Sequence, residues 1–272
     1  MQKEDLVIKK VSKIESAEFI AKHHYRKIMP RLNKVFYGGY IDNELVALIT
    51  LGYGTQPLRT IQKIFPSLST KDYFEVGRMC LVDELKKNSE SYFMSRVFKQ
   101  VKRDYPDIKV IFSWSDGIMG KPGFVYQAVN FFYAGKIKTD IYITKEGYLV
   151  HPRSAKALLE INAKEAGKEK LFWLTDEFCR QQGITRLKGF QFKYLLFTCG
   201  RLEKKRLMRE CTHELSNEYP KMEDIKFFTK QGGKYLESEF PKYKETISSQ
   251  ELKEMCFLDG SMVNIKRANS LI

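Results

Sequence analysis

The stretch KVIFSWSDGIMGKPGFVYQAVNFFYAG, residues 109–135, decides the fold class of this chain. After Lys109, the residues VIFSW are mostly apolar and predict a buried strand, which ends at Ser115 and Asp116. A glycine-rich turn and a short helix follow, so polar groups stand where a strand ends and a helix begins. Open α/β sheets bind ligands at such carboxyl ends. The stretch predicts either a ligand site or an ordinary βα turn.

Patterns on both sides of this stretch extend the α/β prediction. Residues 6–11 read as a strand, 15–24 as a short helix, and 34–40 with 44–51 as a hairpin turned by Asp42 and Asn43. Further along, 73–82 read as a strand and 88–103 as an amphipathic helix. We expect residues 52–72 to form a loop. Residues 1–150 are therefore predicted to form a catalytic α/β domain, with a mixed central sheet flanked by helices.

The second half of the chain differs from the first in its pattern of basic and aromatic residues. Residues 151–272 are expected to form a basic extension that packs on the first domain and possesses DNA-contacting groups. Within it, 186–209 read as an aromatic strand with a basic tail, and 210–272 as irregular or as short helices. The basic residues predicted to contact DNA are Lys188, Lys193, Arg201, Lys204 and Lys205. Such basic runs more often form solvated helix faces than binding surfaces.

Composition limits the classes of protein that remain. The formal net charge is +14, which favours a polyanionic partner, most commonly nucleic acid. Five scattered cysteines without a CxxC pair predict neither a disulfide framework nor a zinc ribbon, and indicate a reducing compartment. The N-terminus has no apolar signal region and no run approaches a membrane span. We therefore expect a soluble, intracellular protein.

Glu75 and Arg78 form the second candidate constellation. On a regular strand, residues three apart face opposite sides of the sheet. Gly77 permits a bulge that would bring both side chains toward one site. Arg78 could then orient a carboxylate or phosphate through its planar guanidinium. A surface ion pair is the alternative.

Asp116 is the candidate general base, because a carboxylate at a strand end can accept the proton of a substrate amine. Capping of the glycine turn is its structural alternative. On the helix that follows, Tyr126, Gln127 and Asn130 share one face, and amide side chains read adenine edges well. His24 or His23 could be a base or a metal ligand, and Tyr25 could stack on or hydrogen-bond to a nucleobase. A polar helix end explains this pair as well.

With these residues in view, the chain resembles the Mom-like family of bacteriophage DNA-modification proteins, a divergent branch of the acetyltransferase-type (GNAT) fold. The resemblance rests on His24-Tyr25 and on three segments: FEVGRMCLVDELKKNSES (74–91), PDIKVIFSWSD (106–116) and GFVYQAVNFFYAG (123–135). It implies a GNAT-like sheet and a transferase that carbamoylmethylates the N6 amine of adenine in double-stranded DNA. Such an enzyme would protect phage DNA from restriction in the host cytoplasm.

The resemblance also implies site residues and co-reactants. It places Tyr25, Arg78, Ser113, Asp116 and Tyr126 at or near the active site, whereas Glu75 is a substrate-binding candidate from the residue pattern alone. The resemblance raises an acyl-CoA-like donor and iron as candidates, and His24 is the candidate metal ligand from the residue analysis. One departure weakens coenzyme A binding: the place of the glycine-rich pyrophosphate loop reads LKKNSE (85–90), without glycine. A conventional acyltransferase on a small amine or protein, and a non-catalytic nucleic-acid-binding protein, are the alternative functions.

Overall fold

The computed structural model describes residues 2–24, 29–54, 56–150, 155–231, 233–247, 255–258 and 261–264. The chain divides into two compact units that are interleaved along the sequence. The first comprises Met1–Ser115, Lys121–Lys136 and Phe192–Pro220. The second comprises Asp116–Gly120, Ile137–Gln191 and Lys221–Ile272. Whether residues 1–150 form a separate catalytic domain stays a prediction.

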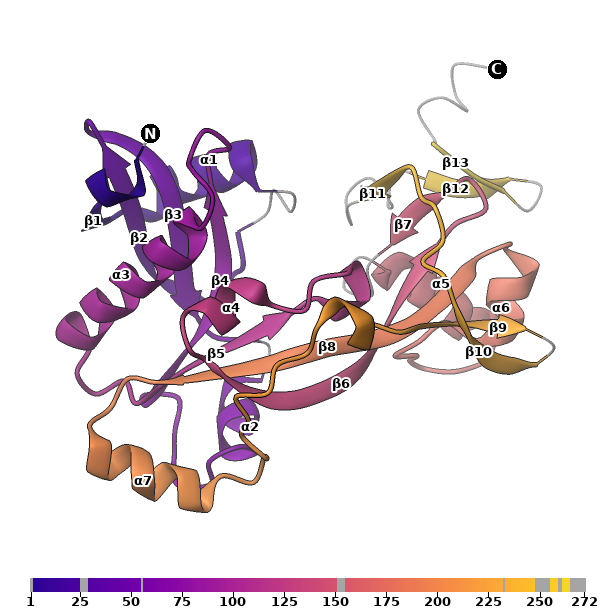
Figure 1. Cartoon of the computed structure of the whole chain (residues 1–272). Helices are drawn as coiled ribbons and strands as arrows, with labels where there is room; N and C mark the ends of the chain where they lie inside the picture. The colour runs from indigo at the N-terminus through magenta and orange to yellow at the C-terminus, as the bar shows by residue number, and fades with distance from the viewer. Residues whose placement is uncertain are drawn as a thin grey trace. The chain divides into compact units, whose positions relative to one another are not determined.

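The first unit is built on a mixed sheet, in the element order that the sequence predicts (Figure 1). Its strands run in the order β1-β2-β3-β4-β5-β8, and every neighbouring pair is antiparallel except the parallel pair β4 and β5. The elements are β1 (Val7–Lys10), α1 (Lys13–His23), β2 (Asn33–Ile41), β3 (Glu44–Gly52), α2 (Pro57–Gln62), β4 (Tyr73–Leu81), α3 (Ser89–Asp104), β5 (Val110–Ser115), α4 (Phe124–Ala128) and α7 (Arg201–Glu210). Strands β6 (Phe132–Ile143) and β8 (Thr185–Phe197) continue from this unit into the second. The predicted α/β class, a mixed sheet flanked by helices, is confirmed.

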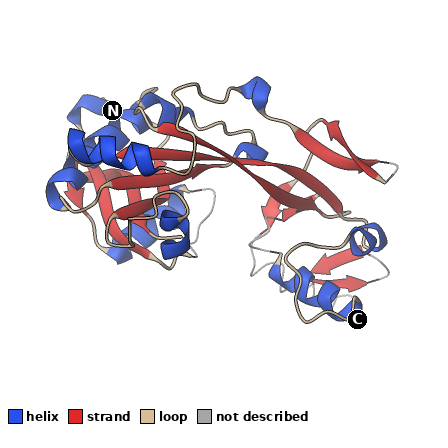
Figure 2. Cartoon of the chain, turned by 90° about the horizontal axis from the view of Figure 1, so that it is seen from below, coloured by secondary structure: helices blue, strands red, loops and turns tan. Residues whose placement is uncertain are grey.

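Helices cover both faces of this sheet, and Figure 2 shows them in blue around the red strands. Leu48 of β3 belongs to a buried cluster with Phe19 and Ile20 of α1. Its neighbour Ala47 pairs with Gly39, where Phe93 of α3 approaches closely. Because successive strand residues point to opposite faces, α1 and α3 lie on opposite sides of the sheet. We call these sides the α1 face and the α3 face.

The α1 face continues over α2 and α7. Ile61 of α2 and Leu207 of α7 share a buried cluster with Tyr73, Val110 and Phe112 from the central strands. Residues 57–62, expected to be loop, form α2 instead, with Pro57 in its first turn. Proline is tolerated there because its missing N–H would have no partner within the helix.

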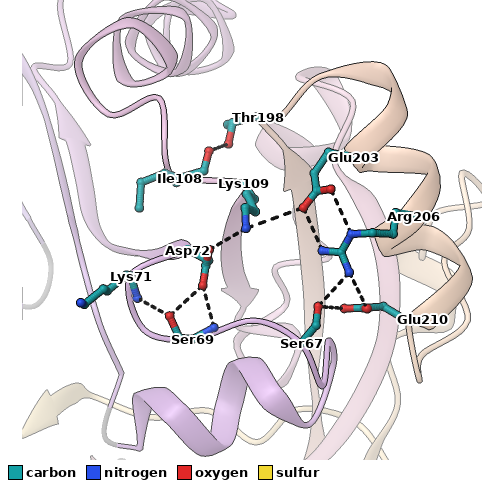
Figure 3. Close-up of polar contacts among 10 residues, drawn as sticks. All are labelled: Ser67, Ser69, Lys71, Asp72, Ile108, Lys109, Thr198, Glu203, Arg206 and Glu210. Atoms are coloured by element: carbon teal, nitrogen blue, oxygen red, sulfur yellow. Dashed lines mark hydrogen bonds and ion pairs between the residues drawn. The ribbon is translucent and has the colours of Figure 1, made fainter.

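A polar network fastens α7 to the loop between α2 and β4 (Figure 3). Lys109 Nζ lies 2.8 Å from Asp72 Oδ1 and 3.7 Å from Glu203 Oε1. Glu203 in turn pairs with Arg206, which also donates to Ser67 Oγ at 3.1 Å. The basic tail predicted after residue 197 is therefore a helix whose charges are partly neutralised within the chain.

The second unit has its own apolar core. Tyr142 of β6 and Val150 of β7 (Tyr148–Val150) pack with residues of α5 (Lys156–Glu165) and α6 (Asp176–Gln181). The segment expected to be irregular instead contains strands, namely β9 (Phe227–Gln231), β10 (Lys234–Ser238), β11 (Glu245–Ile247), β12 (Met255–Leu258) and β13 (Ser261–Asn264). No helix in the described part of the chain is long and apolar enough to cross a bilayer.

Candidate active site

The parallel pairing of β4 and β5 stops midway along both strands. Residues Tyr73–Glu75 pair with Val110–Phe112, and beyond these three positions no further β4–β5 pairs occur within the described residues. Both strands nevertheless continue, β4 to Leu81 and β5 to Ser115. The facing edges therefore leave backbone N–H and C=O groups that the β4–β5 ladder does not use. We call this feature the β4–β5 opening; it lies at the carboxyl ends of parallel strands, where α/β sheets bind ligands.

A β-bulge lies on β4 at the mouth of this opening, as the sequence predicts. The register with β3 shifts there, because Val76 pairs with Leu51 but Arg78 pairs with Thr50. Gly77 is the extra residue, and a side chain would not fit: a Cβ at this position would stand 2.3 Å from Asn33 Oδ1 and 2.8 Å from Thr50 Oγ1. The glycine is thus required by close packing.

Buried hydrogen bonds hold the bulge in place. Asn33 and Thr50 are both buried, and Asn33 Nδ2 donates to Thr50 Oγ1 at 2.6 Å. The same hydroxyl oxygen accepts from the backbone N–H of Arg78 at 2.9 Å. The guanidinium folds back to donate from Nη1 to the Gly77 carbonyl at 2.9 Å. The backbone of Arg78 is therefore fixed by groups from β2 and β3.

The bulge brings Glu75 and Arg78 to the same side of the sheet. Glu75 pairs with Gly52 and Arg78 with Thr50, and these two partners are two residues apart on β3. Glu75 also pairs with Phe112 of the α1-face cluster, so both side chains belong to the α1 face. The carboxylate of Glu75 packs close to Gly54, where a Cβ would stand 2.5 Å from Oε2. Burial raises the pKa of neighbouring Tyr73 well above its usual value, and the Glu75 charge adds to this shift.

Ser113 and Tyr126 lie on the α3 face instead. Ser113 is buried and pairs with Tyr194 of β8, whose ring stacks on Tyr126 with centroids 5.2 Å apart. The Tyr194 hydroxyl donates to the Pro122 carbonyl and accepts from Gln127 Nε2 at 3.2 Å. Burial raises the pKa of Tyr194 to about 12. The structure thus brings Tyr126, Gln127 and Ser113 together around Tyr194, on the face opposite Arg78.

The remaining polar candidates of the central stretch have local structural partners. Asp116 follows β5 and belongs to the second compact unit, where Gln191 Nε2 lies 3.5 Å from its Oδ1. The Gln127 amide also donates to the Pro220 carbonyl at 3.0 Å. Asn130 is exposed and adopts φ +61°, a left-handed conformation that asparagine tolerates well at a helix end. The convergence of Arg78 and Asp116 in one crevice, and the substrate-binding roles of Gln127 and Asn130, stay predictions.

The histidine segment is described only in part. His24 is buried and ends α1, and its N–H donates to the Ile20 carbonyl at 3.0 Å. Tyr25 lies outside the described residues. Within the described part of the chain, no group of three or more His, Cys, Asp or Glu side chains is arranged to hold a metal ion. The described residues therefore do not by themselves provide a donor set for iron, and the role of His24 stays a prediction.

The predicted DNA-contacting residues lie in different surroundings. Lys188 Nζ stands 3.5 Å from the ring centroid of Tyr235, and Lys204 Nζ stands 4.7 Å from that of Phe132. Arg201 and Lys205 are exposed on α7. Lys193, on β8, points its ammonium at an imidazole: Nζ lies 2.8 Å from His213 Nε2. Their contacts with DNA stay predictions.

His213 is a residue that the sequence analysis missed. It follows α7 in a turn with no strand or helix pattern, so only its pairing with Lys193 draws attention to it. Trp114 of β5 is the strand partner of Lys193, and the ammonium lies 6.0 Å from its ring centroid. Trp114 and Lys193 extend the α1-face row of Val110 and Phe112, so they share a face with Glu75 and Arg78.

Comparison with solved structures returns acetyltransferases at low similarity. A variant of the spermidine N-acetyltransferase SpeG from Vibrio cholerae is 9% identical, with 72% of this chain and 95% of that chain covered and a TM-score of 0.39. A Bacillus subtilis acetyltransferase in complex with CoA is also 9% identical, with 71% and 98% covered and a TM-score of 0.34. The fold class therefore stands on the observed sheet and helices themselves.

Comparison of sequences is more informative. The methylcarbamoylase mom of Escherichia phage Mu is 25% identical over 182 residues, which cover 67% of this chain and 71% of the relative. The model of the Mom protein family matches residues 5–221, a range that includes the β4–β5 opening, the Gly77 bulge and the Lys193–His213 pair. This chain belongs to the Mom protein family.

Proposed function

We propose that this protein is a DNA-modifying transferase that attaches a carbamoylmethyl-type group to the N6 amine of adenine in double-stranded DNA. The modified DNA of a phage would then be protected from restriction. Membership of the Mom family and the similarity to the phage Mu methylcarbamoylase support this proposal. The net charge of +14 fits a polyanionic substrate.

The single observation that carries the proposal is the β4–β5 opening. A linear donor can hydrogen-bond to backbone groups of β4 that the β4–β5 ladder does not use, as a peptide does when it adds to a sheet. Arg78 would bind the oxygen atoms of the transferred group, because a planar guanidinium matches a carboxylate or carbonyl. The bulge that fixes the Arg78 backbone limits the reorganisation that binding requires.

The adenine amine would have to leave the base stack to reach this site, as in other enzymes that act on bases of duplex DNA. In the transfer step, the amine nitrogen forms a bond to the donor carbon, the bond between that carbon and the donor's leaving group breaks, and the leaving group departs with the electron pair. The nitrogen then loses a proton. Asp116 is our proposed acceptor of that proton, and Tyr25 the proposed stacking partner of the extruded base. Asp116 Oδ1 lies 3.5 Å from Gln191 Nε2, a long contact that a substrate amine could replace.

An acyl-CoA-like donor would find an anion-binding position at the start of α3. Asn88 precedes this helix with φ +69° and makes no side-chain capping bond. Asparagine thus adopts the left-handed conformation for which glycine is usual. Lys86 and Lys87 are exposed just before it. These residues would hold the phosphates of the donor through the helix N-terminus and two ammonium groups.

The test is mass spectrometry of nucleosides from plasmid DNA after co-expression with the protein. We expect an adenosine derivative enlarged by the transferred group, and its loss with Arg78→Met and with Asp116→Asn. Lys99→Met, on the exposed side of α3, is the control variant that removes a charge elsewhere and should leave the modification intact.

Two other results would contradict the proposal. Unmodified DNA combined with acetyl transfer to polyamines would show a conventional acyltransferase. Unmodified DNA combined with tight, salt-sensitive DNA binding that survives Asp116→Asn would show a non-catalytic nucleic-acid-binding protein.

A further inference from the structure

Lys193 and His213 form a pair of basic side chains on the α1 face of the first unit, where Lys193 is the strand partner of Trp114 on β5. They are twenty residues apart in sequence, and Lys193 Nζ lies 2.8 Å from His213 Nε2. Both side chains are half-buried. An ammonium group has only donors, so the imidazole nitrogen that faces it must accept. With Lys193 protonated, Nε2 of His213 therefore carries no hydrogen in this arrangement.

The other ring nitrogen is positioned by a threonine. The Thr212 hydroxyl donates to the carbonyl of Lys63 at 2.5 Å, and its oxygen lies 3.1 Å from His213 Nδ1. Since the hydroxyl hydrogen is used by the Lys63 carbonyl, the oxygen accepts from Nδ1–H. The hydrogen bonds thus favour one tautomer, with Nε2 open as acceptor toward Lys193.

The surroundings of the pair are positively charged. Burial lowers the pKa of Lys193 and of His213, and the nearby ammonium of Lys63 lowers both further. Lys193 itself also lowers the pKa of His213. From the other elements packed here, Trp114 contributes its ring and Cys211 a thiol whose pKa burial raises. The carboxylate of Glu210 is held by Arg206 at 2.9 Å and by Ser67 at 2.5 Å.

We propose that Lys193 and His213 form a binding subsite for a phosphate group. A phosphate oxygen would accept a hydrogen bond from Lys193 and stabilise a proton on His213 Nε2, so that both side chains become donors to the same anion. The repulsion between the two basic groups is then replaced by attraction to a shared negative charge. The source of the phosphate is either the DNA backbone or a phosphate-bearing donor. The phosphate subsite itself is argued from the side-chain geometry, and only the choice between these two sources rests on the proposed function.

Trp114 provides a direct readout of binding, because its ring lies 6.0 Å from Lys193 Nζ. The chain has two tryptophans, so Trp173→Phe leaves Trp114 as the only indole fluorophore. We would titrate this variant with inorganic phosphate, and separately with a short duplex oligonucleotide. In parallel, nitrogen NMR of His213 reports its protonation.

We expect phosphate to change Trp114 fluorescence and to raise the pKa of His213. Lys193→Met, which keeps the length of the side chain and removes its charge, should abolish both effects. If the phosphate belongs to DNA, the oligonucleotide produces the same changes and Lys193→Met weakens its binding about tenfold. The slope of log affinity against log salt should also fall by about one unit. Lys99→Met is the matched control for lost charge.

Each outcome has a definite meaning. An effect of phosphate without an effect of the oligonucleotide assigns the subsite to a phosphate-bearing small molecule and supports the anion site. The proposal is overturned if neither ligand changes the Trp114 fluorescence or the His213 pKa. It is also overturned if Lys193→Met responds to the ligands as strongly as the chain with Lys193 does. These are binding measurements, so failure of the proposed adenine modification would appear separately, as unmodified nucleosides after co-expression.

Discussion

Replacement of Gly77 by alanine tests whether close packing shapes the bulge beneath Arg78. A Cβ at this position would stand 2.3 Å from Asn33 Oδ1, 2.7 Å from Asn33 Nδ2 and 2.8 Å from Thr50 Oγ1. All three distances are far below ordinary contact, so the Asn33 side chain must move. The 2.6 Å hydrogen bond from Asn33 to Thr50 would be lost inside the protein.

The expected cost follows from these two effects. Overpacking in a core costs about 1–3 kcal/mol, and a buried polar group left without its partner costs about 1–3 kcal/mol. We therefore expect Gly77→Ala to lower the free energy of unfolding by about 2–6 kcal/mol in urea titrations. Because Thr50 also binds the Arg78 backbone, DNA modification should fall as well.

A double-mutant cycle isolates the cause. In an Asn33→Ala background the amide is absent and only Thr50 Oγ1 still obstructs the added Cβ, so Gly77→Ala should cost less than it does in the native chain. Gly200 is the control glycine, since it has φ −69° and a Cβ there would meet nothing within 4 Å. Gly200→Ala should change stability by less than about 1 kcal/mol. An equal cost of Gly77→Ala in both backgrounds would refute the packing argument.

Three further perturbations probe the framework around the site. Although partial burial opposes it, hydrogen bonds from Lys109 and Ser69 lower the pKa of Asp72 below its usual value. A carboxyl with a lowered pKa stabilises the fold above its unfolded pKa, near 4, and loses this effect as pH falls. Asp72→Asn should therefore flatten the pH dependence of stability below about pH 5, and unchanged acid-unfolding curves would contradict this assignment. Tyr194→Phe removes the hydroxyl that joins Gln127 to Pro122, and should cost about 1–3 kcal/mol in thermal unfolding while the ring packing persists. Arg206→Gln breaks an exposed network, so its cost should stay below about 1 kcal/mol, and a larger loss would show that the network is stronger than exposed ion pairs usually are.

The elements that sequence patterns predicted well are those whose cause is local. The apolar residues at helical spacing within 88–103 lie in α3, as predicted. Asp42 and Asn43 form the turn of the first hairpin, with φ of 49° and 64°. The bulge at Gly77 was also predicted from the sequence, because a glycine within a strand often marks a β-bulge. In contrast, α2 and the strands after residue 220 were missed, since short elements take their form from the core they cover.

By itself, the sequence determined the α/β class, the strand that ends at Ser115 and the candidate groups along the central stretch. Only the tertiary structure decided how these groups are shared between two faces of the sheet. It placed β8 from the second half of the chain next to β5, which puts Lys193 beside Trp114 and His213. Periodicity specifies which side of a strand a residue occupies, but the choice of neighbouring strand depends on packing over the whole core. That is why the Lys193–His213 pair could not be read from the chain alone.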